Sequence, residues 1–148
     1  MRKIYLDACA LNRLTDDQSQ LRIRNEAEAV QAIFHGIQQG QVFWVASVVL
    51  KSEIKRNPDR DKRQDALALL SFAQEILTVS PAIIERAETL EALGFGAFDA
   101  LHLACAEDAH VDVLLTTDDR FLRQVARGLG KPRVAVANPI KWLKVALP

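Results

Sequence analysis

Short apolar runs alternate along the chain with longer stretches in which apolar residues recur every three or four positions. The short runs predict strands and the longer stretches predict helices, because a buried strand is nearly all apolar and a helix repeats every 3.6 residues. The predicted strands cover residues 3–6, 42–45, 76–79, 113–116 and 134–136. Strands of this kind, separated by helices, favour a parallel sheet covered on both faces.

The predicted helices fill the connections between these strands. The first has an apolar stripe and is expected to end at Gly40; the stripe consists of Ile23, Ala27, Val30, Phe34 and Ile37. Further helices are expected at about 47–56, 60–73, 98–109 and 120–127. Ser80 and Pro81 suit the start of another helix, and Pro139 suits the start of the last. We therefore expect one α/β domain over residues 1–148.

Charge is distributed unevenly in this chain. The totals are 19 basic and 19 acidic residues, which gives a formal net charge of zero. Residues 120–148, however, contain seven basic residues and no acidic one, which leaves 12 basic and 19 acidic residues in the preceding part. A basic segment beside an acidic body favours a polyanionic partner.

Other features of the composition exclude several classes of protein. No apolar run is long enough to span a membrane, and the first seven residues reach a charge too soon for a secretory signal. Cys9 and Cys105 do not have metal-ligand spacing. We expect a reduced, cytoplasmic protein in which both cysteines pack as small apolar residues.

Acidic residues occur where parallel strands are expected to end. Asp7 follows the first predicted strand, and Asp118 and Asp119 follow the fourth. Glu53 lies on the helix after the second strand, and Asp99 lies in the first turn of the helix before the fourth. The functional crevice of an open parallel sheet lies beyond the carboxyl ends of its strands. Four acids from distant parts of the chain could therefore converge there, namely Asp7, Glu53, Asp99 and Asp118.

Each acid also has an ordinary structural interpretation. An Asp that follows a strand often caps a helix or a turn, which applies to Asp7 and Asp118. The helix dipole favours an acid in the first turn, which applies to Asp99 and Asp119. Glu53 could form an ion pair with Arg56 one turn later, although its neighbours place it on a stripe that faces the core.

Taken together, the four acids predict a metal site. Two carboxylates about 4 Å apart repel by roughly 4 kcal/mol at an effective dielectric near 20, so a shared pocket needs a cation. Oxygen-only ligands with no histidine or cysteine nearby favour Mg²⁺ or Mn²⁺ over Zn²⁺. Such an ion suits hydrolysis of a phosphodiester, because it activates water and stabilises the leaving oxygen.

Basic residues near these acids suit a nucleic-acid backbone. One group surrounds Glu53 and comprises Lys51, Lys55, Arg56, Arg60, Lys62 and Arg63; Arg120 begins the basic C-terminal segment. The alternative for each is a solvated helix face. His102, three residues after Asp99, could pair with it as a ligand, but a single histidine is more often a helix-surface or packing residue. We assign Trp44 and Trp142 to packing.

Four segments resemble, in order, the acidic motifs of the PIN domain. They are Leu6-Asp7-Ala8-Cys9-Ala10-Leu11-Asn12, Val49-Leu50-Lys51-Ser52-Glu53-Ile54, Phe98-Asp99-Ala100-Leu101-His102-Leu103-Ala104 and Leu114-Leu115-Thr116-Thr117-Asp118-Asp119. The ending from Asn138 to Leu143 also resembles that family's ending. The likeness covers essentially the whole chain, and a solitary PIN domain of this size is similar to the VapC toxins of type II toxin-antitoxin pairs.

The resemblance implies a three-layer α/β/α sandwich around a parallel sheet of about five strands. It also implies Mg²⁺- or Mn²⁺-dependent cleavage of single-stranded RNA, a homodimer, and inhibition by a cognate antitoxin. By position, Asp7, Glu53 and Asp99 would be the core metal ligands, with Asp118 as the fourth. Thr116 would orient a ligand, and Asn12 and Asp119 would have supporting roles.

The chain departs from the family pattern at one position and leaves other interpretations open. Ala8 stands where many relatives have Ser or Thr, so a hydroxyl that could orient Asp7 is absent. The polar stretch 15–25 could close over substrate or contact a partner. A phosphatase of the haloacid dehalogenase type would need an Asp at the position of Cys9, and a receiver-like phosphoacceptor fits poorly. The main alternative is a PIN fold that binds RNA or protein with little catalysis.

Overall fold

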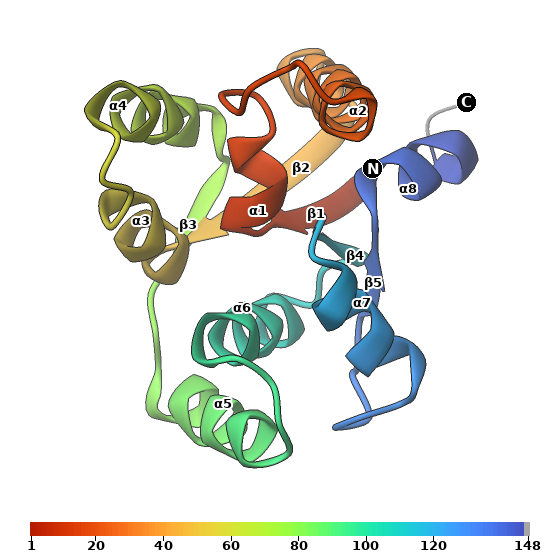
Figure 1. Cartoon of the computed structure of the whole chain (residues 1–148). Helices are drawn as coiled ribbons and strands as arrows, with labels where there is room; N and C mark the ends of the chain where they lie inside the picture. Colours follow the sequence, from red (N-terminus) through yellow and green to blue (C-terminus); the bar gives the residue numbers. More distant parts are fainter. Residues whose placement is uncertain (147–148) are drawn as a thin grey trace.

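The computed structural model describes residues 1–146 and contains a five-stranded sheet in which all paired strands are parallel (Figure 1). The strand order is β3-β2-β1-β4-β5. The strands are β1 (Arg2–Leu6), β2 (Val42–Ser47), β3 (Glu75–Leu77), β4 (Val113–Leu115) and β5 (Ala135–Ala137). The predicted positions of all five strands are confirmed to within two residues.

Eight α-helices are found in the described residues. They are α1 (Ala8–Asn12), α2 (Leu21–Gln38), α3 (Val48–Lys55), α4 (Arg60–Leu69), α5 (Pro81–Ala92), α6 (Ala97–Asp108), α7 (Asp119–Ala126) and α8 (Pro139–Ala146). A single 3₁₀ turn, η1 (Leu70–Phe72), follows α4. Among the helices of residues 1–146, none has both the length and the hydropathy needed to cross a membrane.

The helices form a layer on each face of the sheet, which makes the predicted three-layer α/β/α sandwich (Figure 1). One core packs α1, α2, α3, α4 and α8 against the sheet around Trp44 and Leu50. The other packs α5, α6 and α7 against the opposite face around Tyr5 and Leu114. Alternate residues of one strand therefore enter different cores, as Ile4 and Tyr5 of β1 do.

The order of the strands creates a switch point beside β1. The chain builds the sheet outward from β1 through β2 to β3, and then returns to place β4 and β5 on the other side of β1. At this junction the backbone N–H of Asp7 donates to the carbonyl of Leu115, at 3.2 Å. In open parallel sheets, ligands bind beyond the strand ends at such a point.

Some predicted helix boundaries were wrong. The helix expected at 60–73 ends at Leu69, since the chain tightens into η1 before β3. The five-residue α1 was not expected, because so short a helix shows no measurable period. The stretch 15–25 is a loop only as far as Gln20, and α2 begins at Leu21. The last two residues of the predicted domain, 147 and 148, lie outside the described residues.

Candidate functional site

Asp7 is buried at the carboxyl end of β1, where it begins α1. Its extended backbone and its side chain make it the N-cap, and Oδ1 accepts the Ala10 N–H at 2.9 Å. Its other oxygen, Oδ2, is buried and has no hydrogen-bond partner among the described residues. Burial raises the pKa of Asp7 from 3.8 to about 6, against the lowering effects of His102 and of the nearby Thr116 hydroxyl. An unpartnered buried carboxylate oxygen is a natural ligand for a cation.

Asp118 lies beyond β4, next to Asp7 across the switch point, and is the N-cap of α7. Its Oδ1 accepts the N–H groups of Arg120 at 2.9 Å and Phe121 at 3.2 Å. The Thr116 hydroxyl accepts the Asp118 N–H at 3.1 Å. Thr116 therefore fixes the loop that carries Asp118. Its hydroxyl also lies close enough to Asp7 to lower the pKa of that carboxyl.

Asp99 is half-buried in the first turn of α6 and makes no hydrogen bond with any described residue through its side chain. Burial and, after it, the negative charges of Asp7, Asp118 and Glu53 together raise its pKa from 3.8 to about 7, against the lowering effect of His102. The charges of the other three acids therefore act on Asp99. That the four acids share one metal site stays a prediction.

Glu53 is held by a histidine on the neighbouring helix. Its Oε1 lies 2.7 Å from Nε2 of His102, which is 1% exposed. The expected ion pair between Glu53 and Arg56 does not form within the described chain, since the Arg56 guanidinium lies instead over the Phe98 ring, 5.1 Å from its centroid. Of the two ordinary interpretations of His102, the position on the helix surface was wrong and the packed position is confirmed, since its side chain is buried and contacts Glu53 from inside the core.

Cys9 on α1 lies close enough to the four acids for their charges to act on its thiol. Cys9 is exposed, so the prediction that it packs as a small apolar residue was wrong. Cys105 is buried, which confirms the same prediction for that residue. Partial burial of the sulfur raises the pKa of the Cys9 thiol, and each of the four acids raises it further. The thiol of α1 therefore lies at the rim of the acidic site.

The carboxylates of the four acids fit a hard divalent cation only if water molecules supply the remaining ligands. In residues 1–146 no three carboxylate, histidine or cysteine side chains already surround one ion position. Protein-bound Mg²⁺ usually keeps several waters and takes only one or two carboxylates directly. The unpartnered Oδ2 of Asp7 and the unpaired carboxylate of Asp99 supply such ligands. The residues present therefore fit Mg²⁺ or Mn²⁺.

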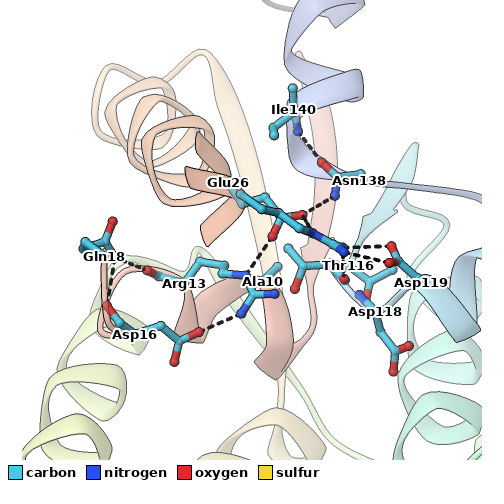
Figure 2. Close-up of polar contacts among 12 residues, drawn as sticks. Ala10, Arg13, Asp16, Gln18, Glu26, Thr116, Asp118, Asp119, Asn138 and Ile140 are labelled. Atoms are coloured by element: carbon cyan, nitrogen blue, oxygen red, sulfur yellow. Dashed lines mark hydrogen bonds and ion pairs between the residues drawn. The ribbon is translucent and has the colours of Figure 1, made fainter. Parts of the chain in front are cut away.

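Glu26 forms a buried network beside this site that was not predicted from the sequence. It is 1% exposed on α2, and its oxygens accept from Arg13 at 2.8 Å, from Arg22 at 3.4 Å and from Asn138 at 2.6 Å. Figure 2 shows Glu26 directed toward Arg13 on one side and Asn138 on the other. The network joins α1, α2 and α8, so it braces the helix that Asp7 caps.

Asp119 and Asn12 are less closely tied to the four acids. Both Asp119 oxygens accept from Arg22, at 2.7 and 2.8 Å, and this ion pair is half exposed. Asp119 is therefore joined to α2 (Figure 2), and Arg22 lowers its pKa. The half-buried Asn12 side chain makes no hydrogen bond with the four acids in the described chain. Supporting roles for both residues stay predictions.

The candidate RNA-binding cations lie on the helices that carry the acids. Lys51, Lys55 and Arg56 are exposed on or directly after α3, and Arg120 is exposed in the first turn of α7. No carboxylate of residues 1–146 lies within 4.0 Å of any of them. These charges are therefore available to an external anion.

Comparison with known proteins places this geometry in a family. Structural similarity is found to a chain of VapBC2 from Rickettsia felis, solved bound to a DNA fragment from its promoter, with a TM-score of 0.56, 16% identity, and coverage of 91% of this chain and 98% of that chain. It is also found to PAE2754 from Pyrobaculum aerophilum, with a TM-score of 0.53, 18% identity, and coverage of 97% and 88%. Comparison with curated proteins gives no significant match. The family model of the PIN domain matches residues 4–128, so this chain belongs to the PIN domain family.

Proposed function

We propose that the chain is a single-domain, Mg²⁺- or Mn²⁺-dependent endoribonuclease that hydrolyses phosphodiester bonds of single-stranded RNA. The observation that supports this most is the site at the switch point, where burial first, and repulsion by Asp7, Asp118 and Glu53 second, raise the pKa of Asp99 to about 7. A protein gains no stability from such repulsion, so the arrangement needs another purpose. Binding a cation that itself binds phosphate provides one.

The four acids have different tasks in this proposal. The buried Oδ2 of Asp7 and the carboxylates of Asp99 and Glu53 would hold the ion, and Asp118 would bind it directly or through water. The bound ion supplies an activated water and stabilises the leaving oxygen. The chain contributes rigidity, because helix capping fixes Asp7 and Asp118 before any ligand arrives.

RNA would be held beside the acids by exposed cations. Arg56 lies three residues after Glu53, and its guanidinium is stacked on Phe98, the residue directly before Asp99. This contact places a planar, weakly hydrated cation at the edge of the site, where it can bind a phosphate or stack on a base. Lys51, Lys55 and Arg120 would hold the adjoining backbone.

The proposed biological role is that of a cytoplasmic toxin. The VapBC2 chain that this protein resembles was solved as part of a complex on promoter DNA, which supports a cognate antitoxin as the partner here. A homodimer is proposed on the resemblance to VapC toxins. A neighbouring reading frame that encodes a small protein with a DNA-binding N-terminus, and co-purification of its product with this chain, would test the pairing.

The function is tested by incubating the protein with a pool of random-sequence, single-stranded RNA. We expect fragments with Mn²⁺ and none with excess EDTA, and the Asp7→Asn variant should yield none under either condition. Asp65→Asn, an exposed acid of α4, is the matched control and should cleave like the wild type. Absence of cleavage by a folded wild type that binds RNA would favour the alternative of a PIN fold used only for RNA binding.

A further inference from the structure

A buried chain of polar side chains leads from the end of β2 to Glu53. The Ser47 hydroxyl lies 2.6 Å from the Tyr5 hydroxyl, which in turn lies 2.6 Å from Nδ1 of His102. Nε2 of His102 lies 2.7 Å from Oε1 of Glu53. Ser47, Tyr5 and His102 are each at most 1% exposed, so no water competes for these contacts.

The direction of the hydrogens along this chain follows from its last bond, given an ionised Glu53 and a neutral imidazole. A carboxylate can only accept, so Nε2 of His102 carries the single N–H and donates to Oε1 of Glu53, and Nδ1 is an acceptor. The Tyr5 hydroxyl then donates to Nδ1, and the Ser47 hydroxyl, whose oxygen accepts the Leu50 N–H at 3.0 Å, donates to Tyr5. Every donor in the chain has an acceptor.

We propose that His102 is a positioning residue that holds Glu53 as an anionic ligand, and that Tyr5 and Ser47 select the tautomer that does so. This inference rests on the proposed metal site. Glu53 is the more exposed member of the His102–Glu53 pair, since 28% of its side chain is exposed against 1% for His102. A glutamate side chain also has three rotatable bonds, so without a partner its carboxylate would not be fixed. A hydrogen bond to Oε1 fixes the carboxylate and leaves its other oxygen for the ion. Outer partners of this kind tune metal affinity in other proteins.

The same geometry argues against His102 as a direct metal ligand. Both of its ring nitrogens are occupied, one by Tyr5 and one by Glu53, and a metal would have to displace one of them. The ring is also held from the side by Phe98, whose ring is stacked at 6.2 Å between centroids and 27° between planes. The imidazole is therefore fixed in the orientation that serves Glu53.

Two substitutions of His102 distinguish the contributions of its two ring nitrogens. A glutamine amide reaches the position of Nε2, whereas an asparagine amide reaches only that of Nδ1. We expect His102→Asn to weaken Mn²⁺ binding by about tenfold or more. His102→Gln should keep most of the affinity because it can still donate to Glu53. Mn²⁺ binding is measured by calorimetry or by electron paramagnetic resonance, with thermal unfolding to check the fold and His35→Asn, an exposed residue of α2, as the control.

Tyr5→Phe provides a test that does not alter His102 or any acid. It removes the hydroxyl that donates a hydrogen bond to Nδ1, so the imidazole loses its preference for the Nε2–H tautomer. We expect Mn²⁺ affinity to fall by about threefold or more, although Tyr5 does not touch Glu53.

The outcomes distinguish this inference from the proposed function. A wild type that neither binds Mn²⁺ nor cleaves RNA overturns both. A wild type that does both, together with equal losses in folded His102→Asn and His102→Gln, overturns the positioning role. Unchanged affinity in a folded Tyr5→Phe overturns the selection of the tautomer.

Discussion

The replacement of Asp99 by asparagine tests the repulsion on which the site depends. The carboxyl's pKa is about 7 in the folded, metal-free protein and 3.8 as the ordinary value. At about 1.36 kcal/mol per pH unit this difference corresponds to at most about 4 kcal/mol. Because the side chain is half-buried and water screens it, we expect about 1–2 kcal/mol to be realised.

The sign of the effect depends on pH. Since the pKa is higher in the folded state, the folded protein holds an extra proton between about pH 4 and pH 7, and it loses stability as the pH rises through this window. Asp99→Asn removes the charge, so at pH 8 without metal it should be more stable than the wild type, with a melting temperature higher by about 3–6 °C. Near pH 4 the two proteins should melt at similar temperatures.

The assay is thermal unfolding at both pH values, with and without Mn²⁺, with Asp65→Asn as the matched control. Mn²⁺ at 100 times its Kd stabilises the wild type by about 2.7 kcal/mol, and the variant should lose most of this gain. If Asp99→Asn is no more stable than the wild type at pH 8 without metal, the carboxylate is not under repulsion and the reasoning fails.

Four further predictions concern neighbouring groups. Mn²⁺ affinity should fall as the pH is lowered from 8 to 6, because Asp99 and Asp7, with pKa values of about 7 and about 6, take up protons that compete with the metal; calorimetry that shows a flat profile would contradict this. Thr116→Val should lower stability by about 1 kcal/mol through loss of the acceptor for the Asp118 N–H, and Thr116→Ser should restore it in urea unfolding. Glu26→Ala should cost about 3 kcal/mol, since it leaves Arg13 and Arg22 without their shared buried partner, whereas Glu28→Ala on the exposed face of α2 should be nearly neutral. Arg56→Ala should raise KM for RNA more than it lowers kcat and should reduce the salt dependence of binding, with exposed Arg24→Ala as the control; an unchanged KM would exclude Arg56 from the substrate path.

The fold could be predicted from local pattern, and one rule of sheet geometry predicts that the four acids lie at the same edge of the sheet. Asp7 ends a strand and Asp118 follows one, so the parallel arrangement alone brings them to the same edge. Asp99 and Glu53 start from helices adjacent to that edge. The positions of the acids therefore did not depend on any particular side-chain rotamer.

The contacts made by charged partners could not be predicted in this way. Glu53 has Arg56 at helical spacing, yet it binds His102, which is 49 residues distant, and Arg56 stacks on Phe98. A local ion pair on a helix is worth only a few tenths of a kcal/mol, so a tertiary contact easily replaces it. Glu26 was missed for the same reason, since its closest partners, Arg13 and Asn138, come from other segments, and only the longer contact with Arg22 is local to α2.

The ion pairs are distributed unequally between the four acids and the rest of the fold. The negative charges of Glu26 on α2 and of Glu107 at the far end of α6 are neutralised by arginines, Arg13 and Arg22 for the first and Arg86 for the second. Within the site, no arginine or lysine of the described residues pairs with Asp7, Asp99 or Asp118. An arginine placed among them would stabilise the folded chain and occupy the position of the ion. The ion pairs of the described residues therefore lie outside the switch point, and the carboxylates there are left without a protein cation, as the proposed metal site requires.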